Sequence, residues 1–164
     1  MARPSFNVAW NASLQIYSSS GSAPHVAKVI GGAVATNINM VGGWTNTCAV
    51  RISYILNKSG VTVPKVKGKT VTGADGSNYF FRVADVIAYL TQRWGKPDVL
   101  LASPPSGGGP LAGKKGLILF EVSGWGDASG HATLYNGTGC YDHCYFNEEG
   151  VNYKTSRAHF WSLG

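Results

Sequence analysis

The clearest helical pattern in the chain begins at Cys48. Apolar residues recur from there at intervals of three and four until the polar segment 57–60, which ends in glycine, stops the run. Asn46 or Thr47, directly before the run, is suited to the N-cap position. We therefore expect a helix with Cys48 in its first turn and an apolar side made of Ala49, Ile52, Ile55 and Leu56.

Two more helices are predicted, one on either side of this one. A short helix starts within residues 22–24, where serine and proline favour a helix start, and ends at the glycine pair 31–32. A longer helix follows from an apolar stripe between Tyr79 and Trp94, and Gly95 ends it. The apolar sides of these helices consist of Val26, Val29 and Ile30 in the first, and of Tyr79, Val83, Val86, Ile87, Leu90 and Trp94 in the second.

The rest of the first half shows no regular pattern. Residues 1–21 are interpreted as a polar lead-in, and the ambiguous segment 34–40 as a loop or irregular structure. Residues 61–64 are expected to be extended. Residues 65–78, which are rich in Gly, Lys and Thr, are expected to form an exposed loop.

The second half of the chain is predicted to form strands. A short strand over 98–102 is followed by residues 116–122, an almost continuous apolar run that is typical of a strand buried on both faces. Residues 132–135 form the next strand. The dipeptide Asn136-Gly137 then favours a turn into a returning strand over 141–146. Helices followed by an antiparallel sheet predict an α+β fold.

Length and composition indicate one domain over residues 1–164, since a core of this size can bury about 70% of the surface of the unfolded chain. Apolar residues make up 44% of the sequence, which excludes a disordered protein. No stretch is apolar over the roughly 18 residues that a membrane span needs, and no apolar signal core follows the start. We expect a protein without membrane insertion that stays in the cytoplasm or leaves it without a cleaved leader.

The net charge of +6 favours anionic partners. The basic residues are scattered, and the two small clusters, at 65–69 and 114–115, do not resemble a nucleic-acid-binding signature. We therefore expect no nucleic acid partner. A cell-wall glycopeptide, which is also an anionic polymer, fits the charge equally well.

Cys48 is a candidate nucleophile because of its expected place at a helix N-terminus. The free backbone N–H groups and the positive dipole end of a helix favour a thiolate, and they can lower the thiol pKa from about 8.5 to roughly 3.5–7.5. The alternative interpretation is a small buried residue at a helix start.

One histidine is suited to act as the base for such a thiolate. His131 follows a glycine-rich loop and begins a predicted core strand, where the rigid sheet holds its side chain but leaves it access to a cleft. Asp142 begins the expected returning strand, so an antiparallel pair can bring its carboxylate beside the imidazole. His131 would then be the general base and Asp142 the group that orients it. His25 and His159 have no setting that suggests catalysis.

The other two cysteines, Cys140 and Cys144, are four residues apart. They can form a disulfide if their Cα atoms come within about 7 Å, but a disulfide implies an oxidising compartment and conflicts with the missing signal peptide. Together with His143 they could instead bind a metal. Three ligands in so short a segment are cramped for tetrahedral zinc, and no fourth is nearby, so we expect no metal and no cofactor.

Longer segments around these residues carry a family likeness. They are Asn46–Arg51, Ser129–Gly137 and Cys140–Asp142, together with the predicted strand 116–120 and the turn 123–125. These segments resemble the type VI secretion amidase effectors of family four, and with the chain length they extend the resemblance over essentially the whole chain.

The resemblance implies a papain-like cell-wall peptidase fold, with N-terminal helices packed on an antiparallel sheet, in which Cys48, His131 and Asp142 are catalytic. It implies a toxin injected into the periplasm of a rival Gram-negative cell, where it cuts peptidoglycan stem peptides between D-glutamate and meso-diaminopimelate. A cognate immunity protein and the tube or spike components of the secretion machine are the implied partners. The family also has a disulfide beside the orienting aspartate, which corresponds to Cys140 and Cys144, and injection into the periplasm removes the conflict with the missing leader.

The sequence does not fix the substrate pocket. Trp44, Trp125 and the segment 103–110, which we expect to be a mobile surface loop, are close enough in sequence to the proposed site to line it. Backbone N–H groups near Cys48, including its own, are expected to stabilise the oxyanion. The competing hypothesis is a wall-binding protein without catalysis, which the aromatic content of 12% and the basic charge also suit.

Overall fold

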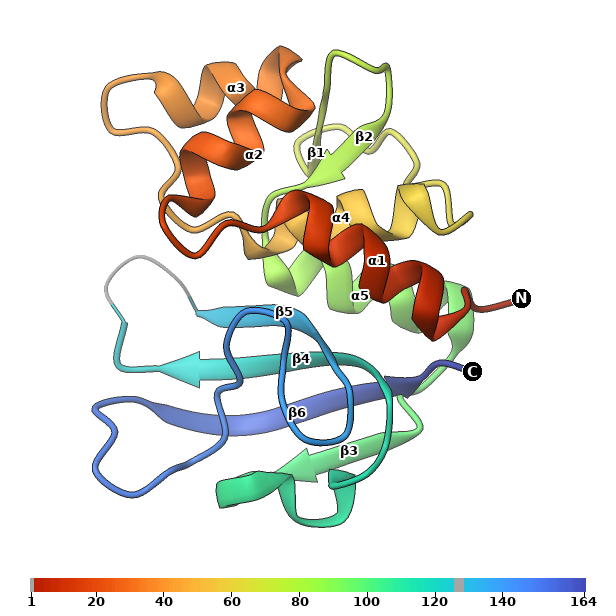
Figure 1. Ribbon diagram of the computed structural model, residues 1–164, viewed down its shortest axis with the longest axis vertical. Coiled ribbons are helices and arrows are strands. Elements are labelled where there is room, and N and C mark those ends of the chain that lie inside the picture. Colours follow the sequence, from red (N-terminus) through yellow and green to blue (C-terminus); the bar gives the residue numbers. More distant parts are fainter. Residues whose placement is uncertain (1, 126–128) are drawn as a thin grey trace.

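Helices occupy one half of the molecule and a four-stranded antiparallel sheet the other, as Figure 1 shows. The computed structural model describes residues 2–125 and 129–164. Residues 126–128, in the glycine-rich loop expected before His131, lie outside the described residues. The architecture is the predicted α+β arrangement.

The helical half is built around α4, which begins at Cys48 as its pattern predicts and is buried from Cys48 to Leu56. It packs against α1 and also against β5 of the sheet. In the described part of the chain, no helix is long and apolar enough to span a membrane. The helices are α1 (Phe6–Ile16), α2 (Ser22–Ile30), α3 (Gly32–Asn39), α4 (Cys48–Lys58) and α5 (Val83–Trp94), with a short 3₁₀ helix, η1 (Ser106–Leu111).

The sheet has the strand order β3-β6-β4-β5, and each neighbouring pair is antiparallel. In β4, Leu117 and Leu119 pack into the core that the helices share, whereas Ile118 and Phe120 pack into a second core on the other face. The predicted burial of this strand on both faces is confirmed. The strands are β3 (Val99–Ala102), β4 (Gly116–Ser123), β5 (Gly130–Tyr135) and β6 (Lys154–Ser162), and β1 (Thr70–Thr72) and β2 (Asn78–Phe80) form a separate hairpin.

α1 lies where the sequence pattern predicts only a polar lead-in, so that prediction is wrong. The buried Ser13 hydroxyl donates to the carbonyl of Trp10 at 2.6 Å, which satisfies a polar group on the apolar side of the helix. Because alanine and serine supply much of that side, the hydrophobic periodicity is weak. The buried residues of α1 are Phe6, Ala9, Ala12, Ser13 and Ile16.

α3 forms over the segment 34–40 that is expected to be irregular, which is a second error. Val34 is its buried residue, so the helix has no apolar stripe to reveal it. Its first residue, Gly32, has a φ of 56°, and a Cβ there would lie 2.6 Å from the backbone N of Ala74. The close approach of the β1–β2 turn therefore helps to fix the start of α3, and this contact is not visible in local sequence.

The expected exposed loop over 65–78 instead contains most of the β1–β2 hairpin, and Tyr79 belongs to β2 rather than to the helix that follows. In the turn, the N–H of Ser77 donates to Asp75 Oδ1 at 3.0 Å. Tyr79 is fully buried, and its hydroxyl donates to Asp75 Oδ2 at 3.0 Å. Tyr79, which the apolar stripe assigns to the start of the helix, is thus a buried residue of a strand.

The returning strand expected over 141–146 does not form, and the C-terminal segment forms β6 beside β4 instead. Tyr135 and Cys140 make a single β-bridge, after which the chain turns. The disulfide between Cys140 and Cys144 holds their Cα atoms 5.3 Å apart, whereas an extended strand would separate them by about 13 Å. The cross-link therefore excludes a strand over these residues.

The two ends of the chain lie on the same side of the molecule (Figure 1). The N–H of Phe6 donates to the carbonyl of Gly164 at 2.7 Å. Nearby, Arg3 forms an ion pair with Asp98, just before β3. These contacts join the start of α1 to the end of β6.

Candidate active site

Cys48 lies at the N-terminus of α4, buried between the helical half and β5. Its Sγ is 3.9 Å from the carbonyl oxygen of Gly130, and its backbone N–H donates to Asn46 Oδ1 at 3.1 Å. Thr47 occupies the N-cap position but makes no capping hydrogen bond with its side chain. The Asn46 side chain therefore satisfies the first free N–H of the helix.

His131 is the second residue of β5, one position later than the sequence analysis places it. Its Nε2 is 3.0 Å from Asp142 Oδ2, and the pair is nearly inaccessible to solvent. His131 also lowers the pKa of the Cys48 thiol, so the imidazole interacts with the sulfur as well as with the carboxylate. The ring of Tyr145 contacts the imidazole edge-on, with the centroids 4.8 Å apart. The imidazole is therefore held between the sulfur and the carboxylate.

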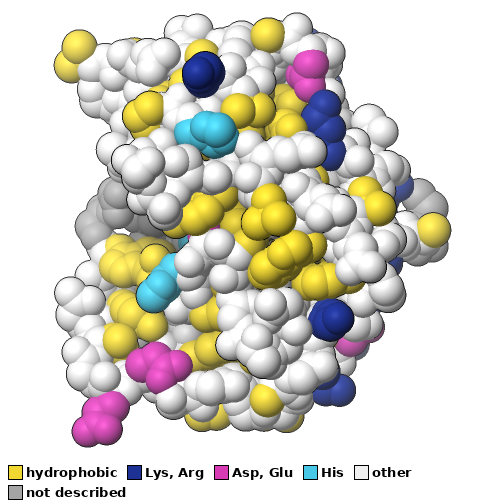
Figure 2. All heavy atoms as spheres, viewed as in Figure 1, with side chains coloured by type: hydrophobic (Ala, Val, Ile, Leu, Met, Phe, Trp, Pro, Cys, Tyr) yellow, Lys and Arg dark blue, Asp and Glu magenta, His cyan; other side chains and the backbone are white. Residues whose placement is uncertain are grey.

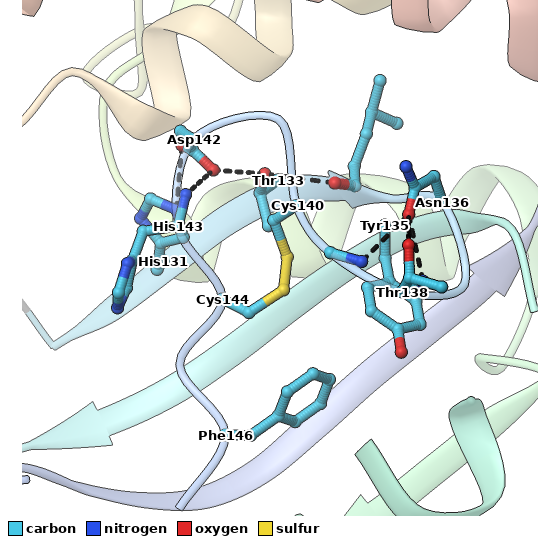
Figure 3. The surroundings of a disulfide bond; sticks show 12 residues. His131, Thr133, Tyr135, Asn136, Thr138, Cys140, Asp142, His143, Cys144 and Phe146 are labelled. Atoms are coloured by element: carbon cyan, nitrogen blue, oxygen red, sulfur yellow. Dashed lines mark hydrogen bonds and ion pairs between the residues drawn. A yellow bond between two sulfur atoms is a disulfide. The ribbon is translucent and has the colours of Figure 1, made fainter. Parts of the chain in front are cut away.

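Asp142 lies inside the loop that the disulfide closes, as Figure 3 shows. Its Oδ1 accepts hydrogen bonds from the Thr133 hydroxyl and from the backbone N–H of His143, both at 2.6 Å. Its Oδ2 faces His131 and also accepts from Arg51 Nη1 at 2.7 Å. Asp142 thus meets His131 from an irregular loop rather than from the strand that the sequence analysis predicts.

Arg51 is a buried member of this cluster that sequence reasoning missed. Besides Asp142, its guanidinium contacts the Tyr141 hydroxyl at 3.0 Å and the Thr47 hydroxyl at 3.2 Å, and it lies over the ring of Tyr17 at 5.0 Å. The available signal is its position three residues after Cys48, which puts both side chains on the same side of a helix. Thr133 was missed in the same way, two residues after His131 on the same face of β5.

The charges of the cluster shift the pKa values of Asp142 and His131 in opposite directions. Burial opposes ionisation of Asp142, but the charge and hydrogen bond of His131 and the charge of Arg51 outweigh it and hold the pKa of that carboxyl well below its usual range. Burial also disfavours the imidazolium, but the Asp142 carboxylate, with a smaller effect of Cys48, raises the pKa of His131 to about 9. His131 is therefore protonated and Asp142 ionised at neutral pH.

The pKa of the Cys48 thiol is lowered. Burial alone would raise this pKa, but the hydrogen bond and charge of His131, the backbone N–H of Ala132 and the charge of Arg51 together outweigh burial. The arrangement can hold a thiolate–imidazolium pair, which is the reactive state of a nucleophilic cysteine with a proton donor beside it.

Cys140 and Cys144 are bonded to each other, which removes both sulfurs as metal ligands. Among the described residues, no group of three His, Cys, Asp or Glu side chains is placed to hold a metal ion. The zinc alternative that the sequence left open for Cys140, His143 and Cys144 thus loses its ligands.

Two cavities flank the cluster, and Figure 2 shows the molecule indented where the helical half meets the sheet. The first, of about 440 Å³, is lined by Cys48 at the start of α4, and the second, of about 320 Å³, by His131. Trp44 lines the first and Trp125 the second, as the sequence analysis suggests. The segment 103–110 lines neither cavity, and part of it forms η1 instead. The residues common to both cavities are Thr45 and Asn46.

Comparisons with known proteins give a consistent result. Residues 44–161 match the family model described as type VI secretion system amidase effector protein 4. The crystal structure of the type VI effector Tae4 from Enterobacter cloacae is similar over 99% of this chain and 98% of that chain, with 41% identity and a TM-score of 0.87. The effector Tae4 from Salmonella typhimurium, solved in complex with the immunity Tai4 from Enterobacter cloacae, is similar over 99% of this chain and 100% of that chain, with 37% identity and a TM-score of 0.86. A search among curated proteins found no match.

Proposed function

The chain belongs to the family of type VI secretion system amidase effectors, family 4, and from this membership we propose that it is a cysteine peptidase that cuts the γ-D-glutamyl–meso-diaminopimelate bond of peptidoglycan stem peptides. The family establishes the broader function, which is that of an antibacterial effector that hydrolyses peptidoglycan. The bond and the catalytic residues are our proposal.

The observation that carries the proposal is the contact chain from sulfur to carboxylate. The His131 imidazole lowers the pKa of the Cys48 thiol, and its Nε2 is 3.0 Å from Asp142 Oδ2. A nucleophile, an acid–base group and an orienting carboxylate in this order are what acyl transfer through a thioester requires.

The proposed reaction proceeds in two stages. The Cys48 sulfur attacks the γ-carbonyl carbon of the D-glutamyl residue, and His131 gives its proton to the diaminopimelate nitrogen as the C–N bond breaks. A thioester between Cys48 and the glutamyl residue remains. His131, now neutral, takes a proton from water, whose oxygen attacks the thioester carbonyl carbon and releases the acid and the Cys48 sulfur. Asp142 stabilises the imidazolium at both stages.

The backbone N–H of Cys48 stays the expected oxyanion donor. The Cys48 N–H, which we expected to take this role, donates to Asn46 Oδ1 in the free protein. Asn46, whose side chain holds this N–H, lines both cavities. Because of this position, we propose its Nδ2 as an additional oxyanion donor.

The partners follow from the solved relatives. Tae4 effectors from Enterobacter cloacae and Salmonella Typhimurium form effector–immunity complexes with Tai4. A cognate immunity protein is accordingly the proposed inhibitor of this chain. Tube or spike components of the secretion machine are its proposed carriers, and the periplasm of the target cell is its proposed place of action.

The test is digestion of purified sacculi, with mass spectrometry of the released fragments. The wild-type protein should yield fragments that end in D-glutamate and fragments that begin with diaminopimelate, and Cys48→Ala should yield none. His25→Ala is the matched control for handling and folding, because His25 lies on α2, outside the site, and contacts the Gln15 carbonyl. Fragment release by folded Cys48→Ala protein would end the proposal, and release of different fragments by the wild type would end the assigned bond.

A further inference from the structure

The two cavities lie on different sides of the reaction proposed above. His131 lines the second cavity and must protonate the leaving amine, so the diaminopimelate side of the substrate belongs there. The first cavity is lined by Cys48 but not by His131. The acyl residue, which becomes bonded to Cys48, therefore occupies the first cavity.

The first cavity has the electrostatic character of an anion site. Arg82 contributes to its wall, and its lining among the described residues contains no Asp or Glu. The first residues of two helices also line it, namely Cys48 and Ala49 of α4 and Val83 and Ala84 of α5, so the positive ends of both helix dipoles face the same space.

Among the residues that the structure describes, Arg82 keeps hydrogen-bond donors that no partner occupies. Its Nη1 donates to the Gly68 carbonyl at 3.1 Å and forms an ion pair with Asp85 Oδ2 at 3.6 Å. Its guanidinium carbon lies 4.6 Å from the centroid of the Phe81 ring, so the side chain packs on that ring. The hydrogen bond and the ion pair both involve Nη1. The other guanidinium N–H groups can therefore donate two hydrogen bonds to one carboxylate.

We propose that Arg82 is the residue that selects the acyl side of the substrate, by binding the free α-carboxylate of the D-glutamyl residue in the first cavity. A glutamyl residue linked through its γ-carboxyl keeps its α-carboxylate unsubstituted, a few bonds from the carbon that Cys48 attacks. The inference rests on the proposed function, because it takes the γ-D-glutamyl bond as the one that is cut. It adds that a stem peptide with an amidated α-carboxyl is a poor substrate.

The experiment compares two synthetic stem peptides, L-Ala-γ-D-Glu-meso-diaminopimelate and its counterpart with a carboxamide in place of the α-carboxylate. Diaminopimelate release gives kcat/KM for the wild type, Arg82→Gln and Arg82→Lys. The wild type should prefer the carboxylate peptide by about 10-fold to 100-fold, the usual effect of a hydrogen bond to a charged group. In Arg82→Gln, kcat/KM should fall for the carboxylate peptide, mostly through a higher KM, and stay unchanged for the carboxamide peptide. The preference is then lost. Arg82→Lys should keep part of the preference.

Two controls separate recognition from structure. Lys96→Gln removes the same charge just beyond the C-terminus of α5, so it should behave as the wild type on both peptides. The rate at which iodoacetamide alkylates Cys48 should be unchanged in Arg82→Gln. Arg82 makes no capping hydrogen bond with its side chain at α5, so the substitution removes no helix cap.

Equal losses on both peptides in Arg82→Gln, or a wild type that does not distinguish them, would overturn the assignment of Arg82 while the proposed bond stands. If the wild type cuts neither peptide yet releases other fragments from sacculi, the proposed bond is wrong, and the inference falls with it.

Discussion

Four side chains of alternating charge lie in a row across the site: Arg51, Asp142, His131 and, as a thiolate, Cys48. Asp142 Oδ2 is shared, because Arg51 Nη1 is 2.7 Å and His131 Nε2 is 3.0 Å from the same oxygen. Arg51 therefore keeps the carboxylate charged, but it also competes with His131 for it. The imidazolium is thus paired with a carboxylate that it shares with Arg51.

The pH range of the reactive ion pair follows from the two shifted pKa values. The pair exists above the lowered pKa of the Cys48 thiol and below the pKa of His131 of about 9. We expect iodoacetamide to alkylate Cys48 rapidly well below pH 8.5, the ordinary thiol pKa being about that value. His131→Ala should move the midpoint of this profile upward, since the burial of Cys48 would then be uncompensated by the imidazolium.

Mass spectrometry of the alkylated protein at a series of pH values measures the pH dependence of Cys48 alkylation. His25→Ala is the control and should follow the wild type. A Cys48 that titrates as an ordinary thiol in the wild type would contradict the proposed ion pair. Hydrolysis should decline above about pH 9 for the same reason, because His131 then has no proton to give.

At the scale of elements, the helices and strands that could be predicted from the sequence are those with a clear apolar pattern of their own. α4 and β4 follow their apolar patterns, with boundaries at Cys48 and Gly116. α3 and β6 depend on distant partners: Gly32 of α3 meets the β1–β2 turn, and β6 lies between β3 and β4. Such contacts leave little trace in local periodicity.

The site shows the same division between local signals and contacts made only by the fold. The adjacency of Cys48, His131 and Asp142 could be predicted from motifs, and their catalytic roles stay predictions until they are tested. Arg51 and Asn46 lie inside the quoted motif around Cys48, but their contacts with Asp142 and with the Cys48 N–H require the folded chain.

The disulfide loop is the element that holds Asp142, and reduction should separate its role in activity from its role in folding. The loop between Cys140 and Cys144 is short, so the cross-link removes little entropy from the unfolded chain, roughly 2 kcal/mol by the loop-closure relation. We expect dithiothreitol to lower peptidoglycan hydrolysis more than it lowers folded content by circular dichroism, because Asp142 is then less well fixed beside His131. The Cys140→Ser/Cys144→Ser double variant should reproduce the effect without reductant.

Equal losses of activity and folded content on reduction would argue that the disulfide acts on global stability alone. The double variant also serves as the control for reductant, since its activity should not change further when dithiothreitol is added.

At the scale of the whole molecule, Asp142 joins the two halves. It contacts Arg51 of α4 on the helical side, and on the sheet side His131 and Thr133 of β5. The carboxylate is almost fully removed from solvent, so these contacts also contribute to the free energy of unfolding.

Replacing Asp142 by asparagine should therefore destabilise the fold as well as reduce activity. At neutral pH we expect a loss of roughly 3–5 kcal/mol, because the buried Arg51 is left without its counter-charge. The folded pKa of Asp142 is lowered, so its contribution to stability is present above the unfolded value of about 3.9 and is lost as the pH falls toward the folded value. The difference between wild type and Asp142→Asn should accordingly narrow below about pH 4.

Urea unfolding at several pH values measures this difference. Asp98→Asn is the control, since Asp98 is paired with Arg3 but partly exposed, and it should cost no more than roughly 1 kcal/mol. A full-sized loss in Asp142→Asn that persists unchanged at low pH would contradict the assigned charge state of Asp142.

The hydrogen bond between the first turn of α1 and the terminal carbonyl has a practical consequence. Gly164 follows β6, whose Ser162 is paired with Gly116, and Gly116 is paired with Tyr135 at the end of β5 remote from His131. The end of β6, and with it the start of α1, therefore lies about 13 Å along the sheet from His131. A reporter domain fused to either end would leave the catalytic cleft accessible to a polymer as large as the cell wall. A circular permutant in which a short peptide links the two ends would do the same.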